Sequence, residues 1–388
     1  MHAFIRQHRE DDLNTLALTL ANRKIPEAPY LLQQIEGWQR LRAKVPSWTE
    51  TDGLEYPSRL SLEQCSGETA ARYKAETVTR LLPEGGTMAD LTGGLGVDFS
   101  FMARHFSRAV YVERQEELCR LARHNFPLLG LETAEVVCAD GEDYLRQMPP
   151  ADLIFIDPAR RDAAGRKTVL IEDCTPDVVS LLPLIMAKCR IAVVKLSPML
   201  DIHRAIAAIG HSVAEVHIVA AGGECKELLL VLRNDNGGKQ VCVADGNCRF
   251  NYAPEDEQTA LVTWAGEVET YLFEPGAALM KAGAFRLISE RFGLKKLHPN
   301  SHLYTAATPV KDFPGRTFAV EGVYGFSKKE LRALCATGER ANIAVRNFPS
   351  TVAELRRRLK VKEGGTAHWF ATTLADGRRV VITAKRES

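Results

Sequence analysis

The chain has 388 residues, 45% of them hydrophobic and 26% charged, which is enough for two to three domains of roughly 100–200 residues with packed cores. No apolar run reaches the roughly 18–20 residues of a membrane span, and the first residues lack the apolar segment of a signal peptide. We therefore expect a cytoplasmic protein with no membrane partner. The nine cysteines include no C-x-x-C pair and no histidines at zinc-finger spacing, so we expect reduced thiols and no metal site.

Charge is distributed unevenly along the chain. The net charge is +1, yet residues 319–388 carry 14 Lys and Arg against 7 Asp and Glu, which leaves the rest of the chain at −6. Such an excess indicates that the C-terminal part contacts an anionic partner, with a solvated basic face as the alternative.

The first 80 residues have the apolar spacing of helices, the last candidate covering 62–82. The period then changes, and seven short apolar runs alternate with helical stretches at 87–91, 109–113, 134–138, 152–156, 190–196, 213–219 and 228–232. Strands separated by helices predict a largely parallel sheet. The last two runs are joined only by 220–227, which is too short for a parallel crossover, so we expect the seventh strand to be antiparallel.

Beyond residue 234 the pattern predicts smaller α+β elements. Helices are expected at 277–292 and after two capping boxes that begin at Ser327 and Thr351. Strands are expected at 241–244, 261–264 and 317–324, and a hairpin at 367–373 and 379–383.

A glycine turn follows the first predicted strand. Glycine permits a tight turn and close approach of a ligand to bare backbone, and the next helix offers unpaired N–H groups. The spacing is not G-x-G-x-x-G, which together with the short hairpin argues against a dinucleotide. A carboxylate at Asp90 would repel a pyrophosphate and favour an ammonium or sulfonium ligand. The cofactor-binding candidates on this turn are Asp90, Thr92, Gly93, Gly94, Gly96 and Asp98.

Acidic residues close the next three predicted strands. Glu113 can accept hydrogen bonds from both hydroxyls of a ribose, and Asp140, followed by Gly141, from the exocyclic amine of adenine. Asp157-Pro158 ends the fourth strand, where proline fixes the turn. Each acid alone is typical of an ordinary cap at the end of a strand. The ordered set of acids, however, predicts a nucleoside-binding site.

This set resembles class I S-adenosylmethionine-dependent methyltransferases over roughly residues 70–234. The resemblance implies an α/β fold with a Rossmann-like seven-stranded sheet, an antiparallel last strand, an N-terminal helical region and C-terminal α+β modules. It implies S-adenosylmethionine as cofactor, its methionine part beside Asp90 and the glycine turn, its ribose at Glu113 and its adenine at Asp140.

The segment Asp157-Pro158-Ala159-Arg160 is similar to the Asp-Pro-Pro-x motif of enzymes that methylate amino groups on bases. Asp157 and the Pro158 carbonyl would then be catalytic, accepting the hydrogens of the amine and directing its lone pair at the methyl group. Ala159 replaces the second proline, and no aromatic residue follows.

Asp-Pro-x-Arg also resembles the turn of uridine-C5 methyltransferases, which need a cysteine nucleophile. The next strand ends in Ser197-Pro198, and Cys189 precedes that strand, so this chemistry is disfavoured. The candidates for substrate binding are Arg160, Arg161, Lys195, Ser197, Arg356, Arg357 and Arg358.

The C-terminal half resembles bacterial proteins that join this domain to ferredoxin-like and THUMP-like modules, which implies an RNA partner. The expected parts are a helical region at 1–80, the methyltransferase domain at 81–234, the ferredoxin-like module at 235–318 and the basic THUMP-like module at 319–388. The sequence thus predicts methylation of a base nitrogen in tRNA or rRNA. The alternatives are a protein or small-molecule acceptor, or an RNA-binding protein with a degenerate methyltransferase fold.

Overall fold

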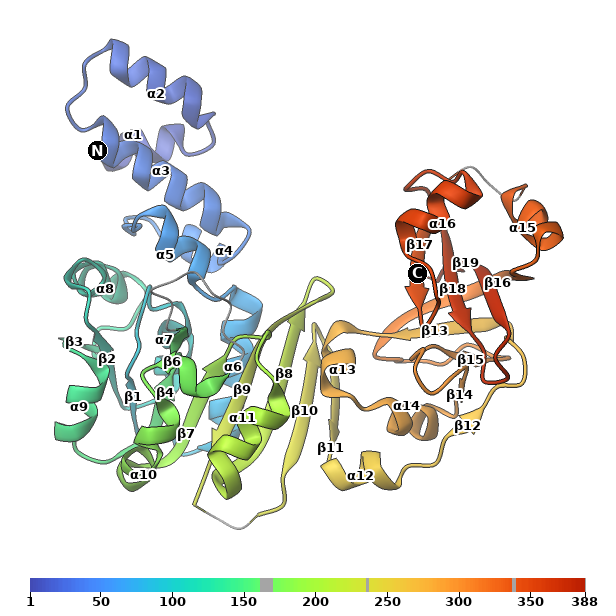
Figure 1. Ribbon diagram of the computed structural model, residues 1–388. Helices are drawn as coiled ribbons and strands as arrows, with labels where there is room; N and C mark the ends of the chain where they lie inside the picture. Colours follow the sequence, from blue (N-terminus) through green and yellow to red (C-terminus); the bar gives the residue numbers. More distant parts are fainter. Residues whose placement is uncertain (161–169, 235–236, 337–339, 388) are drawn as a thin grey trace. The chain divides into compact units, whose positions relative to one another are not determined.

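The computed structural model describes residues 1–160, 170–234, 237–336 and 340–387, so the candidate Arg161 lies outside the described residues. The chain divides into two units (Figure 1), one of residues 1–217 and 226–238 and one of 218–225 and 239–388. Within the described ranges, no helix combines the length and apolar character that crossing a bilayer requires.

The first unit is an α/β structure preceded by helices. Its helices are α1 (His2–His8), α2 (Leu13–Asn22), α3 (Ala28–Arg42), α4 (Pro46–Thr49), α5 (Arg59–Gln64), α6 (Glu68–Leu81), α7 (Val97–Met102), α8 (Glu116–Leu128), α9 (Gly141–Gln147), α10 (Val178–Lys188) and α11 (Ile202–Ile209). Single 3-10 turns are η1 (Ala103–His105), η2 (Ile171–Asp173) and η3 (Gly210–Ser212). The strands are β1 (Thr87–Asp90), β2 (Arg108–Glu113), β3 (Glu135–Cys138), β4 (Ala151–Ile156), β7 (Cys189–Leu196), β8 (Val213–Ala221) and β9 (Glu224–Leu232), with a small separate pair β5 (Ala159–Arg160) and β6 (Cys174–Thr175).

Seven strands of the main sheet follow the order β3-β2-β1-β4-β7-β9-β8. The first five strands run parallel to one another, and β9 runs antiparallel to β7. The predicted sheet and its antiparallel seventh strand are therefore confirmed.

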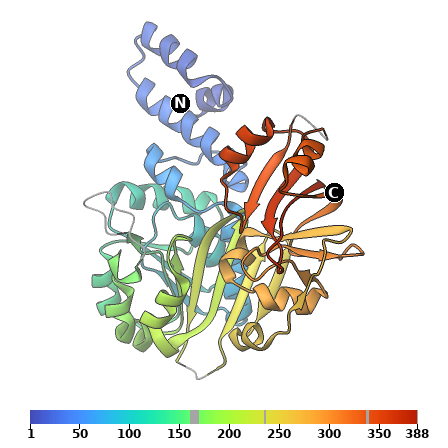
Figure 2. The same cartoon turned by 45° about the vertical axis from the view of Figure 1, so that its right-hand side comes forward.

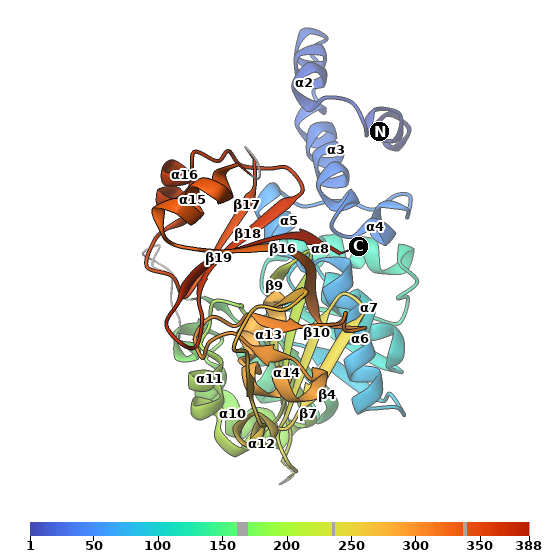
Figure 3. The same cartoon turned by 90° about the vertical axis from the view of Figure 1, so that its right-hand side faces the viewer.

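Helices cover both faces of this sheet. Figure 3 shows α10 and α11 on one side of β4 and β7, and α6 and α7 on the other. Because both faces are covered, the central strands are almost continuously buried, which explains why they read as unbroken apolar runs.

The N-terminal region is helical as predicted, but the single helix expected at 62–82 is wrong. α5 ends at Gln64 and α6 begins at Glu68, because Cys65 and Gly67 adopt extended backbone conformations. The break places Ser66 within hydrogen-bond distance of Lys195 on β7.

Among its described residues, the second unit contains an eight-stranded sheet, called the larger sheet of this unit, and two further strands that pair with each other. Its helices are α12 (Pro254–Thr259), α13 (Ala277–Ala282), α14 (Phe285–Phe292), α15 (Lys328–Cys335) and α16 (Val352–Leu359). Its strands are β10 (Gln240–Asp245), β11 (Cys248–Tyr252), β12 (Thr263–Trp264), β13 (Tyr271–Pro275), β14 (Lys295–Lys296), β15 (Tyr304–Ala306), β16 (Gly315–Gly325), β17 (Asn342–Arg346), β18 (Ala367–Thr373) and β19 (Arg379–Arg386). The larger sheet has the order β12-β14-β15-β13-β16-β19-β18-β17, and β10 pairs with β11.

Several predictions for this unit are confirmed and one is wrong. The hairpin β18–β19 forms, and both capping boxes begin helices, with Ser327 and Thr351 accepting from the N–H groups of Glu330 and Glu354. The helix expected at 277–292 is two helices, because Gly283 takes a left-handed conformation with φ +76° and ends α13.

The helices α15 and α16 lie on one face of the C-terminal strands, coloured orange to red in Figure 2. Leu334, Leu355 and Leu359 pack there against Trp369 and Val381. The opposite face of these strands carries its own buried cluster around Phe318 and Phe370.

Candidate functional site

A pocket of about 670 Å³ opens at the carboxyl ends of β1, β2, β4 and β7 in the first unit. This is the edge where open α/β sheets bind ligands. The structure brings together there the predicted residues Asp90, Thr92, Gly93, Gly94, Gly96, Asp98, Glu113, Asp140, Gly141, Asp157, Pro158, Lys195 and Ser197. Arg160 lies in β5, and the arginines 356–358 belong to α16 of the other unit.

Three aromatic rings pack against the glycine turn. Phe99, Tyr111 and Phe126 lie with ring centroids 5.0–5.6 Å apart, and all three are buried. A Cβ at Gly93 would lie 2.2 Å from the Tyr111 ring, so the turn can rest on the rings only without a side chain there. Gly96 takes a left-handed conformation, with φ +85°. The aromatic rings therefore fix the turn on one side, while its backbone lines the pocket on the other.

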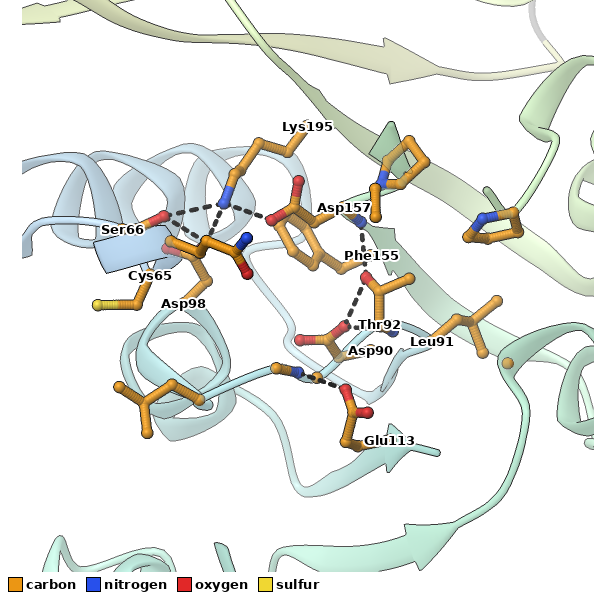
Figure 4. Close-up of a pocket in the computed structure, with 18 of the residues that line it drawn as sticks. Cys65, Ser66, Asp90, Leu91, Thr92, Asp98, Glu113, Phe155, Asp157 and Lys195 are labelled. Carbon is orange, nitrogen blue, oxygen red and sulfur yellow. Dashed lines mark hydrogen bonds and ion pairs between the residues drawn. The ribbon is translucent and has the colours of Figure 1, made fainter. Parts of the chain in front are cut away.

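Glu113 joins the second strand to this turn. Its Oε2 accepts from the Gly94 N–H at 2.9 Å (Figure 4). Its Oε1 accepts from the Gln115 N–H at 2.8 Å. A carboxylate has about four lone-pair positions, so two further donors, such as a pair of hydroxyls, can still be accommodated.

Asp140 is the N-cap of α9, accepting from the Glu142 N–H at 2.8 Å, and the residue itself is exposed. Gly141 packs so closely that a Cβ would lie 2.2 Å from the carbonyl oxygen of Leu91. The cap thus places a carboxylate at the rim of the pocket, next to a close backbone contact.

Asp90 is almost completely buried at the end of β1. Burial raises the pKa of Asp90 to about 8, with Asp98 and Asp157 adding to the effect and the hydrogen bond from the Thr92 N–H opposing it. The group is therefore protonated at neutral pH, and a cation placed beside it would favour its ionised form.

Asp157 is held by Lys195 at the end of β4. The Lys195 ammonium lies 2.6 Å from Asp157 Oδ2, 3.1 Å from Asp98 Oδ2 and 3.0 Å from the Ser66 hydroxyl (Figure 4). Burial opposes the charge of Lys195, but the three acids Asp157, Asp98 and Glu227 keep its pKa well above the ordinary 10.5. Lys195 is therefore a permanent cation and no base.

Asp98 lines the pocket, but protein groups engage its carboxylate. Ser66 donates to its Oδ2 at 2.7 Å, and the Lys74 ammonium lies 3.2 Å from its Oδ1. Although burial alone would raise the pKa of Asp98, the charges of Lys195 and Lys74 lower it to about 2.

Lys74 and Glu227 are not among the site residues predicted from the sequence, and they form a buried ion pair beside Asp98. A signal for Lys74 exists, because it lies on the apolar face of α6 at helical spacing from Ala70, Ala71 and Val78. A lysine at such a position needs a buried partner, but the helix alone does not say which.

Comparison with known proteins identifies two domains in the C-terminal half. A family model for a ferredoxin-like domain matches residues 271–314, and a THUMP-like domain model matches 315–386. Both segments lie within 235–388, where the resemblance implies these modules. Two S-adenosylmethionine-dependent methyltransferases of Mycobacterium tuberculosis, from strains CDC 1551 / Oshkosh and ATCC 25618 / H37Rv, are each 25% identical over 346 residues, covering 88% of this chain and 88% of theirs.

A crystal structure of a protein from Porphyromonas gingivalis W83, assigned as a methyltransferase, has a TM-score of 0.87. The two sequences are 36% identical, and the match covers 100% of this chain and 97% of the Porphyromonas gingivalis chain. The predicted fold class, cofactor and enzyme class are confirmed. The chain therefore belongs to the family of S-adenosylmethionine-dependent methyltransferases that carry C-terminal ferredoxin-like and THUMP-like domains.

Proposed function

We propose that the enzyme methylates a base nitrogen in RNA, of the tRNA or rRNA class. The observation that carries the proposal is the position of Asp157, whose side chain is 39% exposed and lines the pocket beside the glycine turn. A carboxylate and the adjacent Pro158 carbonyl can both accept hydrogen bonds from an amine at that point.

The residues of the pocket fit the cofactor. Glu113 retains acceptor capacity for the two ribose hydroxyls, and Asp140 stands at the rim for the adenine amine. Asp90 is buried and protonated, so it suits a ligand with a positive charge, which lowers the pKa of the carboxyl group and favours loss of its proton. The ammonium of the methionine part is such a charge.

When bound, S-adenosylmethionine supplies a methyl group on a positively charged sulfur, which is already a strong electrophile. The protein's task is therefore mainly positioning. Asp157 and the Pro158 carbonyl accept the two hydrogens of an exocyclic amine, which leaves the nitrogen lone pair directed at the methyl group. After transfer, the nitrogen gives up one proton to Asp157 or to water.

The RNA part of the proposal is supported by the C-terminal module. The THUMP-like match covers 315–386, and residues 319–388 carry 14 Lys and Arg against 7 Asp and Glu. Attraction between such a module and phosphate groups is independent of sequence and would hold an RNA while its base reaches the pocket.

The test is transfer of labelled methyl from S-adenosylmethionine to separated tRNA, rRNA, protein and small-molecule fractions from cells that lack this protein. Label in one RNA fraction, lost in Asp157→Ala and kept in Asp152→Asn at the opposite end of β4, is the expected result. Label only in protein or in the small-molecule fraction would overturn the RNA acceptor. Cofactor binding without any label would overturn the whole proposal.

A further inference from the structure

Four charged side chains form a continuous chain that runs from the buried Lys74 to the partly exposed Asp157 at the acceptor side of the pocket. Lys74 contacts Asp98 Oδ1 at 3.2 Å, Asp98 Oδ2 contacts Lys195 at 3.1 Å, and Lys195 contacts Asp157 at 2.6 Å. Positive and negative groups alternate along it, so each group stabilises the charge of the next.

Lys74 is the innermost member and does not line the pocket. Its side chain is completely buried, and its other partner, Glu227, is 4% exposed. Removing an ammonium from such a site leaves its partner as an uncompensated buried charge, which a protein avoids by neutralising it. The state of Asp98 therefore depends on Lys74.

Glu227 shares the charge of Lys74 with Asp98, because its Oε1 accepts a hydrogen bond from the Lys74 ammonium. Burial raises the pKa of Glu227, and the nearby negative charge of Asp98 raises it further, while Lys74 opposes both. The Lys74 ammonium therefore lowers the pKa of both acids, and its loss raises the pKa of Asp98 as well as that of Glu227.

We propose that Lys74 is a positioning residue for methyl transfer: it keeps Asp98 ionised, so that Asp98 anchors the Lys195 ammonium and Lys195 fixes the Asp157 carboxylate toward the acceptor. This inference rests on the proposed role of Asp157. It also assigns Asp98 to the support of Asp157, because Asp98 Oδ2 accepts from Ser66 and contacts Lys195 while Oδ1 lies 3.2 Å from Lys74.

This role of Lys74 predicts that the kcat of its variants depends on pH. Asp98 is faced by Lys74 from α6, Glu227 from β9, Lys195 from β7, Asp90 from β1 and Cys65 from the segment after α5. Without the charge of Lys74, burial of Asp98 is opposed mainly by Lys195, so the pKa of Asp98 rises and its protonation releases Lys195 as the pH falls. The kcat of Lys74→Met should then be about tenfold or more below wild type at pH 6 and recover toward it at pH 9.

The experiment compares Lys74→Met, Asp98→Asn and the double variant with Arg80→Met as the matched control. Arg80 is on the same helix and pairs with a buried acid, Glu215, outside the pocket. We expect kcat to fall in both single variants, no further fall in the double variant, and an S-adenosylmethionine Kd within about threefold of wild type. If Lys74→Met does not fold, Lys74→Met/Glu227→Gln replaces it, because this variant removes both members of the ion pair.

A second measurement does not depend on activity. In protein labelled with 15N-lysine, the Lys195 ammonium, held by three acceptors, should give a slowly exchanging N–H signal in wild type and Arg80→Met. At pH 6 the signal should be lost in Asp98→Asn and in the Lys74 variant.

Three outcomes overturn the inference: an unchanged kcat across pH 6–9 in the folded Lys74 variant, an equal loss in Arg80→Met, or a Kd that rises in step with the loss of kcat. Failure of the proposed function gives a different result, because then the wild-type enzyme itself transfers no methyl to RNA while the Lys195 signal still depends on Lys74.

Discussion

The hydroxyl oxygen of Thr92 accepts a hydrogen bond from the backbone N–H of Asp157 at 2.6 Å. Thr92 follows β1 and Asp157 follows β4, and these strands are neighbours in the sheet. The same hydroxyl lies 3.4 Å from Asp90 Oδ1, to which it donates. One side chain therefore joins the turn proposed to hold the cofactor to the turn proposed to hold the acceptor.

Thr92→Val keeps the shape of the side chain and removes this link. The Asp157 N–H then lacks its acceptor, so we expect the free energy of unfolding to fall by about 1–3 kcal/mol and kcat to fall about tenfold. Thr92→Ser retains the hydroxyl and should stay near wild type. Chemical denaturation and steady-state kinetics measure the two effects, and equal kcat values in Thr92→Val and Thr92→Ser would contradict the role of the hydroxyl.

Cofactor binding should depend on the protonation of Asp90. The pKa of Asp90 is raised from 3.8 to about 8, so below pH 8 a cationic ligand must displace a proton before it gains the full attraction of the carboxylate. We expect the affinity for S-adenosylmethionine to rise with pH between 6 and 8, by up to about tenfold per pH unit, and to level off above pH 8.

Calorimetry in buffers of different ionisation enthalpy should detect the released proton below pH 8. Asp90→Asn should bind more weakly and lose the pH dependence, whereas Asp152→Asn should keep it, because Asp152 lies at the opposite end of β4 and accepts from the Thr87 N–H. A wild-type affinity that stays constant between pH 6 and 8 would rule out a cationic ligand group beside Asp90.

Gly141→Ala tests the close contact at the rim of the pocket. The new Cβ would lie 2.2 Å from the carbonyl oxygen of Leu91, a backbone atom that can move only with its strand. We expect a loss of about 1–3 kcal/mol in the free energy of unfolding, together with weaker cofactor binding. Gly238→Ala is the control, because a Cβ there meets open space. Equal stability of the two variants would show that the rim adapts without cost.

The three arginines of α16 should contribute differently to RNA binding. Arg356 donates to the Ala341 carbonyl and lies 3.7 Å from Glu363, and the Arg358 guanidinium lies 4.3 Å from the Phe326 ring centroid. Arg357 is exposed, so its charge can meet a phosphate directly.

Arg357→Glu should therefore weaken RNA binding and reduce the salt dependence of log K by about one unit, without loss of stability. Arg358→Glu should also lower stability, since its stacking on Phe326 is lost. Filter binding at several salt concentrations measures the slope, with Lys311→Glu, an exposed residue of the same unit, as control. A slope unchanged in Arg357→Glu would remove this helix from the RNA-binding surface.

Local sequence signals were sufficient for the main sheet and the pocket edge. The apolar runs predicted β1 to β4 because parallel strands covered on both faces are apolar throughout. The short connection 220–227 predicted the direction of β9 because a parallel crossover does not fit into it. The carboxyl ends of neighbouring parallel strands meet at one edge, so Asp90, Glu113 and Asp157 had to lie close together once the strand order was right.

In the C-terminal half, local signals were sufficient only where side chains cap a helix or alternate along a strand. Thr351 and Glu354 marked the start of α16, and the hairpin β18–β19 followed from its pattern. The expected helix at 277–292 failed because an apolar period continues across Gly283 although the backbone reverses there. β13 and β15 are short strands whose partners are distant in the sequence, so no local pattern distinguishes them from loops.

The sheet, the glycine turn and the acids at the sheet edge could be predicted locally, because they depend on periodicity and on the backbone freedom of glycine. Which charged side chains meet could be seen only in the folded protein. Lys74 and Asp98 are 24 positions apart, and Lys195 and Glu227 come from two further strands, yet they surround one carboxylate. The strength of an ion pair depends on the distance between the two charges and on their burial. Distance and burial are fixed only when α6, α7, β7 and β9 pack together.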